Sequence, residues 1–191
     1  MAKKTILLVR HGQYLSASAK SPEKLTALGR RQAKLVGQRL KEVKINTITY
    51  STMPRAIETA TLIKKELKYS GQFKSCDLVR ECVPGFPKKL RKKYGFTDEK
   101  KLIQNEKQVA RAFRKHFKVP TKNSVEVIVC HGNVIRYLVC RSLGIDTLNW
   151  RLMDIQQCGI SIIEVRSKDP QRVLISHNDI GHIPKKDRTF L

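Results

Sequence analysis

The stretch KKTILLVRHGQY, residues 3–14, decides how the rest of the chain is interpreted. Its apolar run ILLV at 6–9 shows no polar alternation, which is typical of a strand covered on both faces. The run ends abruptly in Arg10, His11 and Gly12. Polar residues often mark the exit of a strand. A cation beside an imidazole also fits a strand that delivers both side chains to a phosphate.

Strands and helices alternate along the remaining sequence. Helical spacing begins with Thr26 as a candidate N-cap, and Pro54 suits the first turn of the second helix. The pattern predicts helices at 26–43, 51–67, 99–117 and 133–143, and strands at 3–10, 45–51, 73–79, 125–130, 160–165 and 172–176. A loop is expected up to Pro22, and the last two strands form a hairpin joined through Lys168-Asp169-Pro170. We expect an α/β fold, a three-layer α/β/α sandwich with a mostly parallel sheet, as one domain of residues 1–191.

Two His-Gly pairs follow apolar strands, His11-Gly12 and His131-Gly132. In parallel sheets, ligands bind outside the carboxyl ends of the strands, so both histidines are expected on the ligand side. Arg55 lies in the first turn of the helix after the second strand, where exposed N–H groups favour an anion. Taken singly, a histidine, an arginine or Glu81 after the strand 73–79 is more often structural or a surface residue. Together they fit one site.

These residue types match the needs of phosphoryl transfer. A neutral imidazole can attack phosphorus, and arginines bind two phosphate oxygens at once while disfavouring the imidazolium form. A carboxyl group near phosphate oxygens has a raised pKa and can protonate the leaving oxygen. The sequence therefore favours a phosphate site built from Arg10, His11, Arg55 and His131, whereas Glu81 on sequence alone is expected to be a charged loop residue.

The charge balance is strongly basic. Lys and Arg number 39 against 16 Asp and Glu, a formal charge of +23, which attracts anions. Aromatic residues are only 6% and no nucleic-acid motif is present, so specific nucleic-acid binding is not expected. Residues 85–118 carry twelve Lys or Arg against three acidic residues, and we expect this basic excursion and helix near the active site. Residues 84–101 would form its rim, with Lys88 and Lys89 binding substrate and attracting acidic phosphoproteins or polyanionic small molecules.

Cysteine usage and the N-terminal residues bear on the compartment. Five cysteines without CxxC spacing fit a reducing compartment, with most of them acting as small core residues. The apolar run after Lys4 is too short for a secretion signal or a membrane span. We expect a cytoplasmic protein, with a mitochondrial one as the alternative if a targeting segment is missing from this sequence.

Several of these stretches carry a family resemblance. VRHGQY at 9–14, LTALGRRQA at 25–33, STMPRAIETA at 51–60, Arg80-Glu81 and CHGNVIR at 130–136 resemble, in order, the motifs of the histidine phosphatase (phosphoglycerate mutase-like) superfamily. RHGQY, AFR at 112–114 and CHGNVIRYLVCRSLG at 130–144 are particularly similar to its branch of mitochondrial Ser/Thr protein phosphatases.

The resemblance implies roles for single residues. His11 would be the phosphorylated nucleophile, and Arg10, Arg55 and His131 would line the phosphate pocket. Glu81 would act as general acid and then as base for water. Substrate contacts are also expected from Gln13 and Asn133, and structural support from His177 and His182. His116 matches no motif and is expected at the surface. No metal or organic cofactor is implied.

The resemblance favours a phosphatase that hydrolyses phosphomonoesters, in particular those of Ser/Thr phosphoproteins. A small-molecule phosphatase and a phosphoglycerate mutase are alternatives. The Trp-Asn that family mutases carry shortly after RHG is absent, and the first Trp is Trp150. A third alternative, motivated by the charge, is a basic adaptor on an inactive phosphatase fold. A homodimer is compatible with each of these.

Overall fold

One mixed sheet organises the protein. The computed structural model describes residues 1–15, 23–168 and 172–190. Within them the strands are ordered β3-β2-β4-β1-β5-β6. Their bounds are β1 Lys3–Arg10, β2 Thr47–Tyr50, β3 Gln72–Ser75, β4 Ser124–Cys130, β5 Ile160–Arg166 and β6 Arg172–Asp179. β1 to β4 are mutually parallel, whereas β5 pairs antiparallel with β1 and β6 antiparallel with β5.

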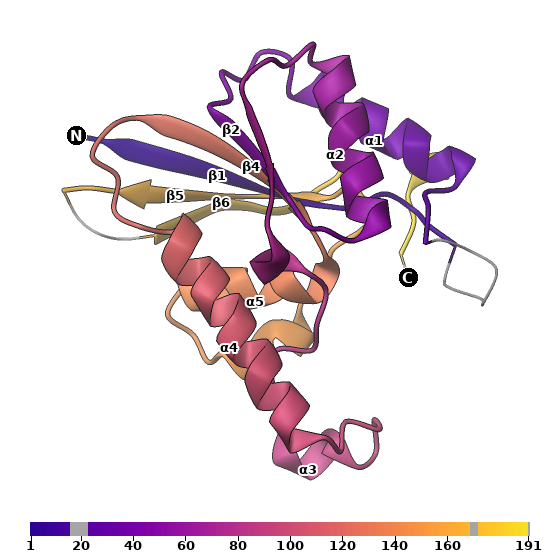
Figure 1. The fold of residues 1–191 in the computed structure, drawn as a ribbon, viewed down its shortest axis with the longest axis vertical. Helices are drawn as coiled ribbons and strands as arrows, with labels where there is room; N and C mark the ends of the chain where they lie inside the picture. The colour runs from indigo at the N-terminus through magenta and orange to yellow at the C-terminus, as the bar shows by residue number, and fades with distance from the viewer. Residues whose placement is uncertain (16–22, 169–171, 191) are drawn as a thin grey trace.

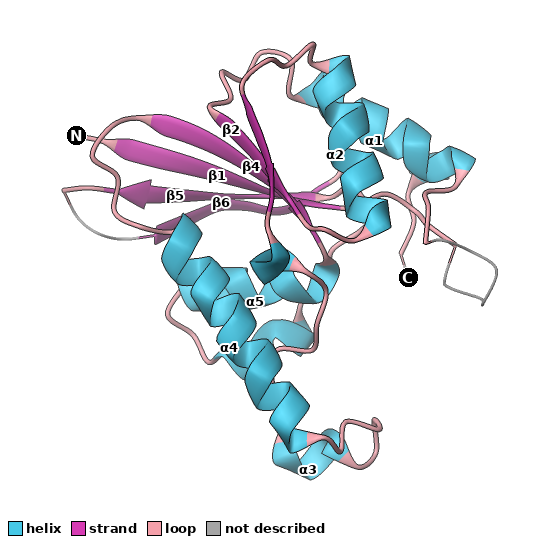
Figure 2. Cartoon of the chain, in the orientation of Figure 1, coloured by secondary structure: helices cyan, strands magenta, loops and turns pink. Residues whose placement is uncertain are grey.

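Helices cover both faces of this sheet (Figure 1). α1 (Ala27–Arg39) and α2 (Pro54–Glu66) pack on one face, and α4 (Glu99–His116) and α5 (Gly132–Ser142) on the other (Figure 2). The short α3 (Lys88–Arg91) lies at the end of α4 that is farther from the sheet. Three 3₁₀ turns complete the described elements: η1 Asp77–Val79, η2 Thr147–Leu152 and η3 Lys185–Asp187. The predicted three-layer, mostly parallel α/β/α sandwich is confirmed.

The run of apolar residues in β1 serves two hydrophobic cores. Leu7 and Val9 pack into the core beneath α1 and α2, whereas Ile6 and Leu8 pack into the core beneath α4 and α5. All four side chains are at most 4% exposed. Successive side chains of a strand point to opposite faces, so a central strand needs apolar residues at every position.

Most predicted elements match the observed ones in type and place. Thr26 caps α1, because its Oγ1 accepts a hydrogen bond from the Gly29 amide at 3.0 Å. The strand predicted at 73–79 ends at Ser75 and gives way to η1, and η2 and η3 were not predicted. The loop up to Pro22 and the turn at 168–170 lie largely outside the described residues. The single-domain interpretation of residues 1–191 stays a prediction.

The surface position predicted for His116 is wrong. Its side chain is 4% exposed, and its Nδ1 lies 2.9 Å from Glu126 Oε1. The buried residues Val109, Ala112 and His116 follow one another at helical spacing on the sheet-facing side of α4. The basic character of the helix belongs to its other faces and concealed this stripe.

No helix among the described residues is both long enough and apolar enough to span a bilayer.

The loop after β1 packs against the first turn of α1 through two glycines. A Cβ at Gly12 would lie 2.6 Å from the Gly29 carbonyl oxygen, and a Cβ at Gly29 would lie 2.0 Å from the Gln13 carbonyl oxygen. Backbone atoms cannot yield as the end of a flexible side chain can. The close approach therefore fixes the position of His11 relative to α1.

We expect Gly29→Ala to lower the free energy of unfolding by about 1–3 kcal/mol, because the new methyl group forces two backbone segments apart. Urea denaturation measures this change. The control Lys34→Ala, on the exposed side of the same helix, should change stability by less than about 0.5 kcal/mol. Unchanged or increased stability of Gly29→Ala would contradict the interpretation.

Candidate active site

The two histidines of the His-Gly pairs meet at the carboxyl ends of the central strands. β1 and β4 pair in a register that sets Arg10 opposite Cys130, and the His11 amide donates to the Cys130 carbonyl at 3.0 Å. The ring centroids of His11 and His131 are consequently 5.1 Å apart. Arg55 is the second residue of α2, the helix that follows β2, and its side chain also contacts His11.

Hydrogen bonds fix the tautomer of His11. Its Nδ1 lies 2.9 Å from the Gly12 carbonyl oxygen, which can only accept, so Nδ1 carries the proton. Arg55 Nε, which can only donate, lies 3.2 Å from His11 Nε2. Nε2 therefore holds the lone pair and is the nucleophilic atom.

Burial keeps this imidazole neutral. His11 is 1% exposed. Desolvation lowers the pKa of His11 to about 3, and the charges of Arg10 and Arg55 act in the same direction. The hydrogen bond to Gly12 opposes this shift without cancelling it. A lone pair is thus present at Nε2 at neutral pH without any base to remove a proton.

Two buried guanidinium groups flank His11. Arg10 Nη1 donates to the Ile155 carbonyl at 2.5 Å, and Arg10 Nε is buried without a hydrogen-bond partner among the described residues. The Arg55 Cζ atom lies 4.5 Å from the ring centre of Tyr14, and Arg55 Nη1 pairs with Glu23 at 2.5 Å. Both arginines are at most 5% exposed. Their fixed forks suit a tetrahedral dianion.

His131 is held by Ser51. Its Nε2 lies 2.7 Å from Ser51 Oγ, while its buried Nδ1 has no partner among the described residues. Burial, reinforced by His11 and Arg55, lowers the pKa of His131 well below the ordinary value. In the tautomer in which Ser51 donates to Nε2, Nδ1 carries the proton and can donate to a phosphate oxygen.

Glu81 completes the site from a loop. It lines a pocket of about 260 Å³ together with Arg10, Asn133, Arg136 and Asp154, among others. Burial raises the pKa of Glu81 to about 7, against the opposing Cys82 amide and three arginines. A carboxyl group with this pKa is partly protonated at neutral pH and can act as a general acid.

Side chains of α4 and η2 hold the Glu81 loop in place. Gln108 Nε2 donates to the Leu78 and Arg80 carbonyls at 3.3 and 3.0 Å, and Asn105 Nδ2 donates to the Val83 carbonyl at 3.2 Å. On the other side, Trp150 Nε1 donates to the Gly85 carbonyl at 3.1 Å. The acid is therefore placed by side-chain contacts and not by the sheet.

The structure brings five predicted catalytic residues together and places the other candidates differently. Asn133 lines the pocket and accepts a hydrogen bond from Arg136, while Gln13 Oε1 accepts from the Thr26 hydroxyl at 2.7 Å. Lys88 and Lys89 lie on α3, and no hydrogen bond or ion pair within the described ranges joins them to the pocket. Substrate binding by these four residues stays a prediction.

Sequence reasoning missed four contributors. Arg136 stands one helical turn after Gly132 and was inside the quoted CHGNVIR, so i,i+4 spacing could have found it. Ser51 likewise stood inside a quoted motif. Asp154 and Glu23 carry no sequence signal, because only the tertiary fold brings them to the pocket and to Arg55.

The two other predicted histidines are engaged with the protein itself. His177 Nδ1 lies 2.9 Å from Ser161 Oγ, and its Nε2 lies 2.9 Å from the Asp154 carbonyl oxygen. His182 Nε2 lies 3.1 Å from the Cys158 carbonyl oxygen. Nowhere in 1–15, 23–168 or 172–190 do three His, Cys, Asp or Glu side chains come together as metal ligands would.

The arrangement provides an unprotonated imidazole nitrogen, cations for phosphate oxygens and an acid on one pocket wall. These are the parts that transfer of a phosphoryl group to a histidine requires.

Comparisons with known proteins agree with this chemistry. Two curated relatives are named serine/threonine-protein phosphatase Pgam5, mitochondrial. The one from Caenorhabditis elegans is 37% identical over 99% of this chain and 67% of its own length. The one from Caenorhabditis briggsae is 36% identical over 99% and 68%. The solved structure of phosphoglycerate mutase from Plasmodium falciparum superposes with a TM-score of 0.68 at 25% identity, over the whole of both chains.

The family itself is shown by a sequence model that matches residues 6–86 and 91–178, nearly the whole sheet and all five residues of the site. The chain belongs to the histidine phosphatase superfamily (branch 1) and is a phosphatase.

Proposed function

We propose that the protein hydrolyses phosphomonoesters of serine and threonine in phosphoproteins, through a phosphohistidine formed at His11 Nε2. The observation that carries the catalytic part is the hydrogen-bonded, neutral tautomer of buried His11, with its lone pair facing Arg55 and the charge of Arg10 acting on the same ring. The substrate class is supported by the names of the relatives.

In the first step, His11 Nε2 attacks phosphorus, so that a P–N bond forms as the P–O bond to the substrate breaks. Arg10 and Arg55 neutralise the charge on the transferred group. Glu81 gives its proton to the leaving oxygen. In the second step, the Glu81 carboxylate takes a proton from water, which attacks phosphorus and returns His11 to its free form.

The Arg55 side chain must move within the site during this cycle. Its Nε occupies the hydrogen-bonding position at His11 Nε2, and its Nη1 is paired with Glu23. Phosphate oxygens would take over both contacts. Glu23 thereby holds the guanidinium buried and in place until an anion arrives.

The relatives' names also support a mitochondrial setting, which is the alternative to the cytoplasm. Acidic phosphoproteins as partners and a homodimer remain predictions.

Replacement of the nucleophile tests the proposal directly. His11→Ala should release inorganic phosphate from phosphoserine and phosphothreonine peptides about 10³-fold more slowly or worse, because no P–N bond can form. The wild type should trap an acid-labile phosphoenzyme, and His11→Ala should not. The control His182→Asn, outside the pocket, should keep its activity.

Other outcomes of this assay would change the assignment. Conversion of 3-phosphoglycerate to 2-phosphoglycerate would indicate a mutase. A higher kcat/KM for sugar phosphates than for phosphopeptides would indicate a small-molecule phosphatase. If the wild type released no phosphate from any of these substrates, the basic adaptor on an inactive phosphatase fold would be the remaining alternative.

The pKa of Glu81 predicts a pH dependence. The first step needs the protonated acid, so kcat/KM for a phosphoserine peptide, which reports formation of the phosphoenzyme, should fall as pH rises through about 7. Glu81→Gln should abolish this limb and lower kcat/KM about 10²- to 10⁴-fold. The loss of kcat/KM should be far smaller with p-nitrophenyl phosphate, whose leaving group needs no proton, although kcat should fall on both substrates because hydrolysis of the phosphoenzyme lacks its base. The control Glu106→Gln, at an exposed position of α4, should leave the profile unchanged; an equal loss of kcat/KM on both substrates would contradict the acid role.

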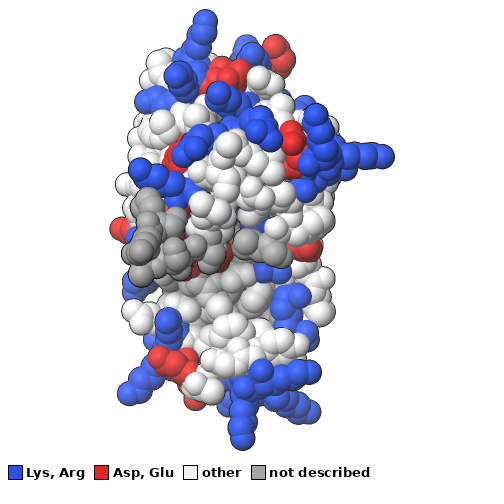
Figure 3. Space-filling view, turned by 90° about the vertical axis from the view of Figure 1, so that its right-hand side faces the viewer, with Lys and Arg blue, Asp and Glu red and all other residues white. Residues whose placement is uncertain are grey.

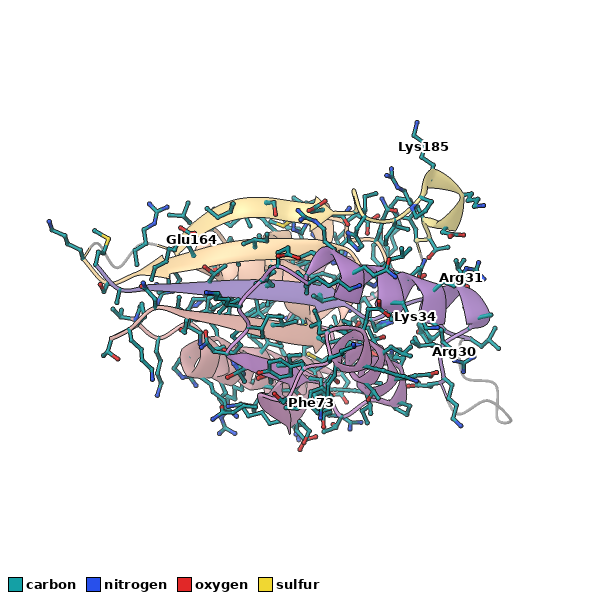
Figure 4. All side chains as sticks on the ribbon, turned by 90° about the horizontal axis from the view of Figure 1, so that it is seen from above. Arg30, Arg31, Lys34, Phe73, Glu164 and Lys185 are labelled. Carbon is teal, nitrogen blue, oxygen red and sulfur yellow. The ribbon has the colours of Figure 1, made fainter. Side chains whose placement is uncertain are left out.

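The basic rim is proposed to select protein substrates. Seen from the side of the carboxyl ends of the strands, Lys and Arg gather at the two extremes of the face (Figure 3). One group belongs to α3 and its surroundings, and the other includes Arg30, Arg31 and Lys34 of α1 with Lys185 of η3 (Figure 4). Because α3 lies at the far end of α4, an extended acidic protein suits Lys88 and Lys89 better than a small phosphomonoester.

Removing Lys88 and Lys89 together, each replaced by Ala, should raise KM for an acidic phosphoprotein about 3- to 10-fold at low salt, with the effect fading at high salt. KM for p-nitrophenyl phosphate should not change. The paired control Lys41→Ala with Lys44→Ala removes the same charge before β2, at the amino end of the sheet. A similar rise in this control would show that net charge, and not α3, is responsible.

A further inference from the structure

A second cluster of ionisable groups lies beneath the sheet on the α4 side, outside the phosphate pocket. Cys76 follows β3 directly, and its Sγ lies 3.9 Å from His116 Nε2. His116 Nδ1 lies 2.9 Å from Glu126 Oε1. This carboxylate also accepts from the Thr49 hydroxyl at 2.7 Å and pairs with Lys4 at 2.7 Å. The result is a Cys–His–Glu relay in which a carboxylate orients the imidazole toward a thiol.

The cluster carries the charges that an ion pair needs. Glu126 is ionised, because His116 and Lys4 hold its pKa at about 2 against the effect of burial. Lys115 Nζ approaches Cys76 Sγ at 3.7 Å from the exposed side. A carboxylate behind the imidazole favours its protonated form, and an imidazolium with an ammonium group beside the sulfur favours the thiolate.

The pKa directions agree with this geometry. Burial alone would raise the pKa of Cys76, but the His116 hydrogen bond and the charges of His116 and Lys115 lower it below the usual range. Burial alone would lower the pKa of His116, but Cys76 and Glu126 raise it. The other four cysteines shift the opposite way: burial raises the pKa of Cys82 to about 12 and raises those of Cys130, Cys140 and Cys158 as well.

Small solutes can approach the cluster. A pocket of about 210 Å³ is lined by Lys4, Lys74, Lys115, His116 and Glu126, among others. Cys76 itself is 6% exposed and does not line the pocket, but Lys115 and His116, whose side chains contact its sulfur, both do. No catalytic residue of the phosphate site lines this pocket.

We propose that Cys76 is a reactive thiolate, paired with the His116 imidazolium, and a site of oxidation by hydrogen peroxide and related hydroperoxides. The thiolate attacks one peroxide oxygen, so that an S–O bond forms and the O–O bond breaks. His116 Nε2 gives its proton to the departing oxygen, which leaves as water or an alcohol. The sulfur is oxidised by two electrons to the sulfenic acid and the peroxide is reduced by two.

The first test is site-selective alkylation of the whole reduced protein by limiting iodoacetamide, read by peptide mass spectrometry. Cys82 is the matched internal control, because its residue is more exposed than Cys76 but its thiol is neutral. Cys76 should react on the order of tenfold faster at neutral pH. Preferential labelling of Cys82 would show that exposure alone governs reactivity and would overturn the proposal.

The second test is the pH profile of this reaction. The charged groups that contact the Cys76 sulfur are Lys115 and His116 of α4, and Glu126 of β4 and Lys4 of β1 act through His116. Lys74 of β3 lines the adjoining pocket, and Asp77 of η1, the next residue in the chain, accepts a hydrogen bond from Thr52. The rate at Cys76 should level off at a lower pH than the rate at Cys82, which should still gain about tenfold per unit up to pH 8.5. A Cys76 rate that climbs as steeply as that of Cys82 would contradict the thiolate.

Variants then separate the partners. His116→Asn can still donate to Glu126 but no longer reaches Cys76, so it should restore the steep profile at Cys76. An unchanged profile would exclude the imidazolium. Should His116→Asn fail to fold, the exposed Lys115→Ala and the wild-type profile still decide the matter, since Lys115→Ala should shift the plateau to higher pH.

The oxidation itself is read with dimedone, which labels sulfenic acids, after stoichiometric hydrogen peroxide. Label is expected on Cys76 in the wild type and in Cys82→Ser, and is expected to be lost in Cys76→Ser. Label on any other cysteine, or none on Cys76, would overturn the oxidation step.

Discussion

Everything at the site depends on the parallel pairing of β1 with β4, in the register that sets Arg10 opposite Cys130. This register brings two His-Gly steps, 120 residues apart in the chain, to the same level of the sheet. Because helices cover both faces of the sheet, the two imidazoles are buried and shielded from water. A shift of one residue would turn every side chain of β1 to the opposite face of the sheet. The residues that now pack beneath α1 and α2 would then face α4 and α5, and the reverse.

Burial shifts the pKa values of His11 and Glu81 in opposite directions, and both shifts favour the proposed reaction. It disfavours the charged form of each group, which is the cation for His11 and the anion for Glu81. The same dry surroundings therefore leave a base without its proton and an acid with its proton. The excess of 23 positive charges takes little part in this, since buried Arg55 contacts His11, buried Arg10 acts on it through its charge, and most other cations lie at the surface.

Local sequence patterns predicted the structure wherever residues close together in the sequence determine it. The unbroken run 6–9 indicated a strand covered on both faces, and Thr26 indicated a helix start. The positions of Arg10, His11, Arg55 and His131 could be predicted because strand ends and helix starts are local features, whereas the position of Glu81 depends on side chains of α4 and η2. Asp154, Glu23 and the burial of His116 could not be predicted in this way, because they depend on packing between segments far apart in the chain. The loop that carries Glu81 stayed imprecise for the same reason: side chains of α4 and η2, and not its own pattern, hold it.

The hydrogen bonds that hold the Glu81 loop have a consequence for the phosphorylated form of the enzyme. His11 directly follows β1 and is tied to β4 by its backbone amide, whereas Glu81 depends on a few side-chain hydrogen bonds from Asn105, Gln108 and Trp150. Local release of this loop would leave the sheet intact. Such a partly opened molecule could still accept a phosphoryl group from a reactive donor, but would lack the base that transfers it to water. The fold thus allows a long-lived phosphorylated state in which the enzyme stores the phosphoryl group instead of turning over.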